Sequence, residues 1–227
     1  MPTDRALRAT FRDFLERAIA AGPDSPVRYD LDVPKWQFLS YAADRGGVVL
    51  HGSGDPDIAA FEPRRAHDVN EFGDQAAIYA ACDGIWPIFF AIVDRPRYHG
   101  TLVNACLRVE GTEERGYFFS LNQTVLDAGP WRDGTVYLLP ADGFRSDELI
   151  ERGGLLLRPA QVARSTPVVP IAKLAVTPGD FPFLSNVRGH DEAMIGARCE
   201  ADPDGFPWLE DERPAAHTRV IRWRSGR

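Results

Sequence analysis

Apolar residues near the start of the chain recur at helical spacing. Thr3 stands where a helix cap is expected, and Gly22 is followed by Pro23, which stops a helix. This pattern predicts an amphipathic N-terminal helix that docks on the rest of the protein. The apolar positions of its docking face are Leu7, Phe11, Leu15 and Ile19. A second short helix is predicted over residues 36–44.

Two short apolar runs bounded by polar segments predict buried strands. The first covers residues 48–50 and leads directly to His51, and the second covers residues 76–80. Residues 54–74 between them have little periodicity, so we expect a surface loop in which Phe61 anchors a turn. After the second strand, Asp83 is expected to cap a helix that ends near Val93 and is apolar nearly all round.

The second half of the chain alternates predicted strands with turns, and a helix is expected only near residues 146–151. The strands are expected at residues 102–109, 116–121, 135–139, within 155–164, and at 168–176, with a last one at 218–223. Early helices followed by strands predict an α+β fold, because the regular alternation of a doubly wound sheet is missing. We expect one domain over residues 1–227, with a helical part at 1–45, a core at 46–180 and an irregular part at 181–227.

Composition excludes several classes of protein. The chain has 227 residues, of which 44% are hydrophobic and 26% are charged, as in an ordinary globular protein. The net charge of -7 gives no indication of nucleic-acid binding. Three widely spaced cysteines and a charged N-terminus predict a cytoplasmic protein without a membrane span. Neither the histidines nor the carboxylates have the spacing of metal ligands, so no metal is expected.

His51, Gly52 and Ser53 stand together where the first buried strand opens into the polar loop. A histidine nitrogen can bond a ribose hydroxyl, and glycine lets a ligand approach the backbone closely. Serine adds a second polar contact, so the string predicts a nucleoside-sized binding site. Alone, however, it favours a structural histidine at the end of a strand.

Tyr79 lies among alanines in the second predicted strand. Small neighbours leave space around the ring, so its face can stack on a planar heterocycle. The alternative is a core tyrosine whose hydroxyl is paired.

Taken in order, the segments around His51 and Tyr79 resemble the ADP-ribosyltransferase superfamily, in its poly(ADP-ribose) polymerase-like and RNA 2'-phosphotransferase-like branch. In that branch a strand ending in H-G-[ST] is followed by a loop, by F-G-x-G-[IV]-Y-[FL]-[AS] and by a helix. The matching residues are His51-Gly52-Ser53, Phe72-Gly73 and Ile78-Tyr79-Ala80, followed by the helix expected from Asp83. The resemblance covers residues 36–94, and the rest of the chain is compatible in being rich in strands.

The resemblance implies an α+β fold whose split mixed sheet surrounds a nucleotide cleft, with NAD as the substrate. By carry-over, His51 bonds the nicotinamide ribose, Gly52 holds the carboxamide through its backbone, and Ser53 supports the ribose. Tyr79 stacks on the nicotinamide ring. The implied reaction is glycosyl transfer, in which ADP-ribose passes from nicotinamide to an unknown acceptor or to water.

The catalytic carboxylate is where the chain departs from the family. The transferases carry Glu at the start of a late strand, whereas residues 155–176 contain no Glu. Gln161 is the polar residue nearest to that position, and Glu148 and Glu151 precede it on the predicted helix. Gln161 is therefore the candidate catalytic residue, although an amide can bond a ribose but cannot act as a base.

Two alternatives to an active ADP-ribosyltransferase remain open. A non-catalytic nucleotide-binding module would account for Gln161 in place of a carboxylate. An RNA 2'-phosphotransferase-like enzyme would need arginines around His51 to bind phosphate. The candidate arginines are Arg64, Arg65, Arg158 and Arg164.

Overall fold

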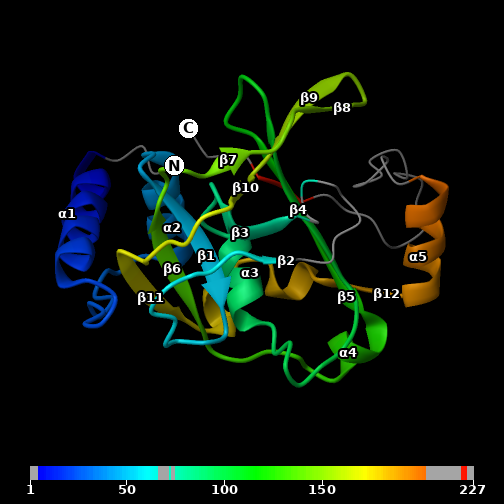
Figure 1. The fold of residues 1–227 in the computed structure, drawn as a ribbon, viewed down its shortest axis with the longest axis horizontal. Coiled ribbons are helices and arrows are strands. Elements are labelled where there is room, and N and C mark those ends of the chain that lie inside the picture. The colour runs from blue at the N-terminus through cyan, green and yellow to red at the C-terminus, as the bar shows by residue number, and fades with distance from the viewer. Residues whose placement is uncertain (1–4, 66–71, 73–74, 203–220, 224–227) are drawn as a thin grey trace.

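The computed structural model describes residues 5–65, 72, 75–202 and 221–223. It is an α+β protein with two β-sheets, one antiparallel and one mixed, and an N-terminal helix (Figure 1). Among the described helices, none is long and apolar enough to cross a membrane.

The first sheet is antiparallel and contains the two strands that carry the motifs His51-Gly52-Ser53 and Ile78-Tyr79-Ala80. Its strand order is β11-β6-β1-β3-β10-β7, with β2 paired to β3. The strands are β1 (Val48–Ser53), β2 (Arg64–Arg65), β3 (Ala76–Ala81), β6 (Gly134–Pro140), β7 (Arg145–Ser146), β10 (Gln161–Arg164) and β11 (Ala172–Val176).

The second sheet is mixed, because β12 runs parallel to β5 while the other pairs are antiparallel. Its order is β12-β5-β4-β9-β8, and β13 also pairs with β5. The strands are β4 (Leu102–Val109), β5 (Arg115–Asn122), β8 (Ile150–Arg152), β9 (Leu155–Pro159), β12 (Arg188–His190) and β13 (Ile221–Trp223).

The two sheets meet at Ala160, where the chain leaves β9 and enters β10. The N–H of Ala160 donates to Cys106 on β4, at 2.9 Å, and its carbonyl accepts from Cys82 directly after β3, at 2.8 Å. A single residue therefore joins the hydrogen-bond ladders of both sheets. Gln161, the first residue of β10, follows it directly.

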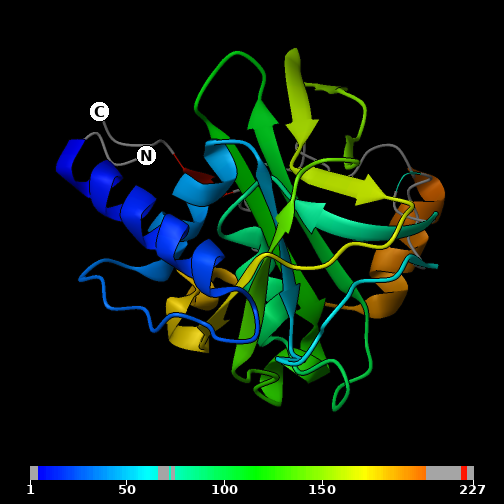
Figure 2. The same ribbon diagram turned by 60° about the vertical axis from the view of Figure 1, so that its left-hand side comes forward.

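Five helices complete the described fold: α1 (Arg5–Ala21), α2 (Lys35–Asp44), α3 (Trp86–Ile92), α4 (Gln123–Asp127) and α5 (Glu192–Ala201). Two 3-10 turns cover Pro178–Asp180 and Leu184–Asn186. Helix α1 packs beside α2 at one side of the molecule (Figure 2). Helix α3 lies between the sheets: it packs on β1 and β6, and the ring of Phe89 is 4.8 Å from that of Phe119 on β5.

Two glycines allow α3 to lie directly on the first sheet. A Cβ atom on Gly52 would come within 1.8 Å of the Pro87 carbonyl oxygen, and one on Gly134 within 2.1 Å of the Ala91 oxygen. Because these obstacles are backbone atoms, neither position has room for a side chain. Gly52 thus has a packing role that is independent of any ligand.

Several expectations from the sequence are confirmed. Helix α2, strand β1, strand β3 and a helix after Asp83 occur where they were predicted. Phe61 is buried and its backbone pairs with Val168, so it does anchor its loop. The run at residues 155–164 is divided into two strands that belong to different sheets, because the chain changes sheets at Ala160.

Other expectations are wrong. Ile19 is 39% exposed, and the buried face of α1 includes Phe14 and Ala18 instead. The helix expected near residues 146–151 is absent. Residues Arg145–Ser146 and Ile150–Arg152 form strands there, since Gly153 and Gly154, with φ of 55° and 75°, turn the chain into a hairpin. The short β2 and the helices α4 and α5 were not expected. The Thr3 cap and residues 218–220 of the last predicted strand lie outside the described residues.

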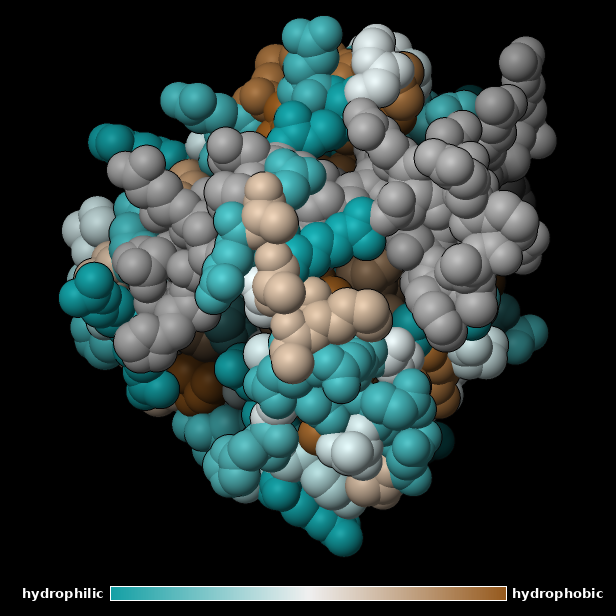
Figure 3. Space-filling view, turned by 90° about the vertical axis from the view of Figure 1, so that its right-hand side faces the viewer, coloured by the Kyte–Doolittle hydropathy of each residue, from teal (hydrophilic) through white to brown (hydrophobic). Residues whose placement is uncertain are grey.

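The β8–β9 hairpin carries exposed leucines at one end of the molecule. Leu149, Leu155 and Leu156 are 39%, 40% and 43% exposed. Figure 3 shows hydrophobic surface at the height of this hairpin, above the hydrophilic surface lower on the same face. The hairpin is distant from His51, which lies on β1 of the other sheet.

Candidate functional site

Strands β1 and β3 separate just before His51, Gly52 and Ser53. They share the pair Leu50↔Ala81, and no further pair joins them among the described residues. Beyond that pair, β1 continues alongside β6 as far as Ser53, and β3 continues alongside β10 back to Ile78. The facing edges of β1 and β3 therefore part between Leu50 and Ser53.

The hydrogen-bond alternation of the sheet fixes where the backbone of Gly52 points. The carbonyl of Gly47 accepts from the N–H of Ala141, across the β1–β6 edge. In an antiparallel ladder such pairs alternate, so the backbone of His51 faces β6 and that of Gly52 faces β3. The N–H and C=O of Gly52 thus face the side on which β3 has moved away.

The imidazole of His51 spans part of this separation. Its Nδ1 lies 2.6 Å from the carbonyl oxygen of Tyr79, and its ring packs at 4.6 Å from that of Phe61. A carbonyl only accepts, so Nδ1 carries the proton. Burial lowers the pKa of His51, although the bond to the Tyr79 carbonyl opposes that shift. At neutral pH the ring is uncharged, and Nε2 is an acceptor that no described residue bonds.

Tyr79 presents its backbone to His51 and its phenol to another part of the protein. Its hydroxyl accepts from the N–H of Gln75 at 3.1 Å and can donate to the carbonyls of Phe72 and Gln75, each at 3.0 Å. Its neighbours Ile78 and Ala80 join the apolar cluster that also contains Phe61. Because side chains alternate along strands, the phenol of Tyr79 projects from one face of the sheet and the ring of His51 projects from the other. A ligand touching both side chains must therefore pass between β1 and β3.

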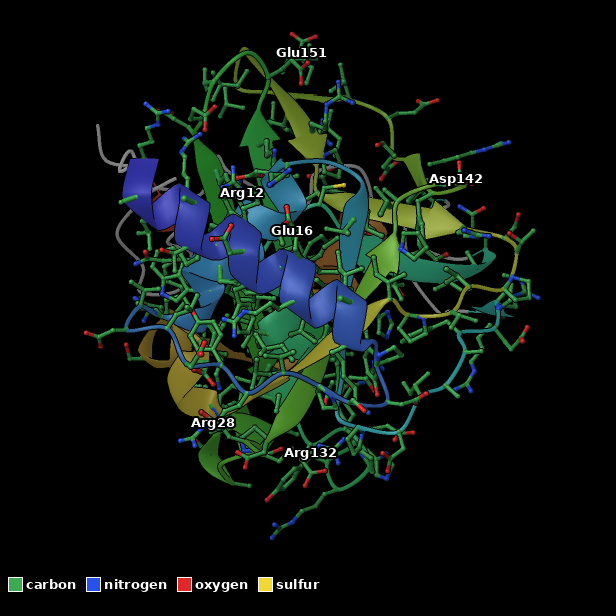
Figure 4. The ribbon with its side chains drawn as sticks, turned by 90° about the vertical axis from the view of Figure 1, so that its left-hand side faces the viewer. Arg12, Glu16, Arg28, Arg132, Asp142 and Glu151 are labelled. Carbon is green, nitrogen blue, oxygen red and sulfur yellow. The ribbon has the colours of Figure 1, made fainter. Side chains whose placement is uncertain are left out.

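The loop after β1 lies against an arginine. The Ser53 hydroxyl accepts from the N–H of Asp55 at 3.1 Å. A Cβ on Gly54 would fall 1.5 Å from a terminal nitrogen of Arg132, so the guanidinium occupies the place of a side chain. Arg132 lies 3.8 Å from Asp94, and its buried Nε has no hydrogen-bond partner among the described residues. Figure 4 places Arg132 at the end of the molecule opposite Glu151.

Gln161 begins β10, on the far side of β3 from β1. It is in register with Ala81, the residue that pairs with Leu50. The three strands carrying His51, Tyr79 and Gln161 are consequently neighbours in the order β1-β3-β10. Gln161 sits at the closed end of the separation, two residues along β10 from Ala163, the partner of Tyr79. The structure brings the strands together without bringing the three side chains into contact.

A buried ionic cluster fixes the segment that follows β3. Asp83 is fully buried, and one of its carboxylate oxygens accepts from the N–H groups of Ile85 and Trp86 at 2.8 Å each. The other oxygen accepts from Arg115 at 2.7 Å and from the Tyr117 hydroxyl at 2.8 Å. One side chain thus bonds the first backbone N–H groups of α3, whose N-cap position is Ile85, and ties the first sheet to β5.

The cluster continues to Asp44 at the end of α2. One Asp44 oxygen accepts from both Arg115 and Arg108, and Arg108 also donates to the carbonyl of Cys82. Burial lowers the pKa of Arg115, but the charges of Asp83 and Asp44 outweigh it and the pKa is raised. Burial and the nearby Asp83 raise the pKa of Tyr117, so its hydroxyl stays protonated and donates. Apart from the cap expected at Asp83, no pattern in the sequence indicates this cluster.

The arginines considered from the sequence do not gather at His51. Arg64 and Arg65 are exposed on β2, and Arg158 pairs with Glu110 on the other sheet. Arg164 donates to Thr166 and to the carbonyl of Asp142, at 2.7 to 3.1 Å. Arg132 lies beside Gly54, which directly follows His51-Gly52-Ser53. It was not among the candidates, because it is 78 residues away from Gly54 in the chain.

Comparison of the chain with protein-family models, with curated proteins and with solved structures finds no match.

Proposed function

We propose that the chain binds NAD in the manner of an ADP-ribosyltransferase, with the nicotinamide end between β1 and β3. The observation that carries the proposal is the backbone of Gly52, whose N–H and C=O face the widening side of the sheet. A carboxamide has one donating and one accepting group, as a strand backbone does. It can pair with Gly52 as a neighbouring strand would, and so satisfy groups that are costly to leave unpaired.

His51 supports the same orientation of the ligand. Its Nδ1–H is fixed by the Tyr79 carbonyl, and the uncharged ring leaves Nε2 as an acceptor. A ribose hydroxyl is a suitable donor to that atom. The imidazole and the Gly52 backbone are adjacent in the chain, so one nicotinamide riboside can reach both.

The proposed reaction breaks the bond between the ribose carbon and the nicotinamide nitrogen. The bonding electrons leave with nicotinamide, which neutralises its positive ring, and the sugar cation is captured by an acceptor or by water. Gln161 lies on the third strand and can bond a ribose hydroxyl, but its amide cannot stabilise the cation as a carboxylate would. The arrangement therefore supports NAD binding more strongly than rapid turnover.

Nicotinamide and nicotinic acid test the role assigned to Gly52. The two molecules have the same ring, but the carboxylate of nicotinic acid has no hydrogen to donate to the Gly52 carbonyl. We expect nicotinamide to bind about tenfold more tightly, because a buried unpaired carbonyl costs ~1–3 kcal/mol. Titrations followed by NMR would measure both constants. Equal affinities, or binding of neither, would contradict the proposal.

A second candidate is an RNA 2'-phosphotransferase-like activity, and Arg132 is the observation that favours it. Its guanidinium lies against Gly54, directly after His51-Gly52-Ser53, where a phosphate could be bound. Incubation with NAD and an RNA carrying a 2'-phosphate distinguishes the two functions. Loss of that phosphate in the wild type but not in Arg132→Gln would select the second candidate.

A further inference from the structure

A small cavity lies on the surface between α3, β4 and α4, and its lining includes none of the residues of the proposed NAD site. It has a volume of about 150 Å³, and Val93, Leu102 and Val125 supply its apolar wall. The connection from Val93 to Leu102 forms the rest of its lining. This segment lies beside α4 at the lower end of the molecule in Figure 1. The volume suits a single small group and is too small for a nucleotide.

The polar side of the cavity includes one cationic side chain, that of Arg95. Arg95 and His99 line it, as does Tyr98, whose hydroxyl donates to the carbonyl of Ala128 at 3.2 Å. None of the described residues that line the cavity is acidic. An arginine and a histidine beside an apolar wall form the kind of pocket in which a phosphate or carboxylate group binds.

Behind the cavity, the Thr101 hydroxyl connects to a buried histidine. Thr101 lines the cavity, and its Oγ1 lies 2.7 Å from Nε2 of His190. The Nδ1 of His190 lies 2.7 Å from the Ser120 hydroxyl, which is 3.2 Å from the carbonyl of Arg188. Asp191 and Glu192 are the charged groups that act on this imidazole, and they oppose the lowering of its pKa by burial.

This chain of hydrogen bonds has two arrangements. In the first, Ser120 donates to Arg188, His190 donates from Nδ1 to Ser120, and Thr101 donates to Nε2. In the second, Ser120 donates to Nδ1 and His190 donates from Nε2 to Thr101. The Thr101 hydrogen is then free for a ligand, so an anion that accepts from Thr101 favours the tautomer protonated at Nε2.

We propose that this cavity is a binding site for one phosphate or carboxylate group of a small molecule, held by Arg95, His99 and Thr101. Its occupation changes the tautomer of His190. The site shares no residue with the proposed NAD site, so either can exist without the other.

Titration with inorganic phosphate and with acetate, each followed by NMR of labelled full-length protein, tests the proposal. We expect saturable shifts of the Gly100 and Thr101 amides with at least one of the two anions, and their relative affinities identify the preferred group. The Arg95→Gln variant should bind about tenfold more weakly. Arg97→Gln is the matched control, because Arg97 stacks over Tyr98 at 5.1 Å and does not line the cavity.

The imidazole nitrogens of His190 give a second measurement. On saturation, the proton signal should move from Nδ1 to Nε2, and the Thr101→Val variant should bind more weakly without that change. No saturable shift with either anion would overturn the proposal, as would equal affinity of the wild type and Arg95→Gln. A His190 tautomer that does not respond to a bound anion would overturn the role of Thr101.

Discussion

Replacing Asp83 by asparagine tests the cluster that joins α3 and β3 to the second sheet. The carboxylate accepts four hydrogen bonds, two from the start of α3 and two from Arg115 and Tyr117. An amide of the same shape can keep the two bonds to the helix with its oxygen. Its NH₂ group must then face Arg115, which donates and cannot accept.

The expected cost follows from the burial of the partners. Asp83 is 0% exposed, and the side chain of Arg115 is 10% exposed. Breaking a buried ion pair from one side costs ~3–5 kcal/mol, because the remaining charge is left without its counter-charge. Asp44 still pairs with Arg115, so we expect a loss of about 3 kcal/mol in the free energy of unfolding.

Urea unfolding followed by tryptophan fluorescence measures this loss. Tyr117→Phe removes one bond to Asp83 and should cost about 1 kcal/mol, so it remains folded even if Asp83→Asn does not. Asp13→Asn is the control, because Asp13 is 67% exposed and its ion pair is with Arg12, which is 51% exposed. A loss below about 1 kcal/mol for Asp83→Asn would mean that the cluster is solvated and that its ion pairs are not buried.

Three further results are expected. Gly52→Ala should destabilise the fold by about 1–3 kcal/mol in the same assay, because its Cβ would meet the Pro87 carbonyl; unchanged stability would contradict that close approach. Tyr79→Ala should weaken NAD binding by about 1 kcal/mol through lost stacking, and unchanged affinity in a folded variant would remove Tyr79 from the site. The pKa of His51 is lowered in the folded state, so the unfolded chain binds more protons than the folded protein does. The free energy of unfolding therefore decreases as the pH is lowered below about 6.5, the pKa of histidine in the unfolded chain. His51→Gln should flatten that dependence in urea titrations between pH 7 and pH 5, and an unchanged slope would show that His51 does not contribute.

Most elements of the fold could be predicted, because their burial follows from local pattern. Val48, Val49 and Leu50 are buried as their apolar run indicates, and Asp83 bonds the start of α3, although that helix begins at Trp86 with Ile85 at its N-cap. Local pattern failed where long-range contacts decide. Residues 155–164 resemble one strand, yet Ala160 bonds both sheets and divides it.

The site shows the same division. The sequence pointed to His51 and Gly52, which are adjacent in the chain and therefore visible as a string. It could not reveal that Gly52 faces the side where β3 departs, since that depends on the register of three strands. Arg132 was missed for a similar reason: its contact with Gly54 is made by folding alone.

Calorimetric titration of NAD into the full-length protein, with nicotinamide release assayed in the same samples, shows whether the space between β1 and β3 binds NAD. We expect stoichiometric binding that is lost in His51→Ala, with the fold of that variant verified by its urea unfolding. Gln37→Ala should bind like the wild type and Gln161→Ala more weakly, because Gln37 lies on α2 and Gln161 on the strand next to Tyr79. Release of nicotinamide together with binding would establish the transfer or hydrolysis. Absence of NAD binding by the folded wild-type protein would rule out the proposed NAD site.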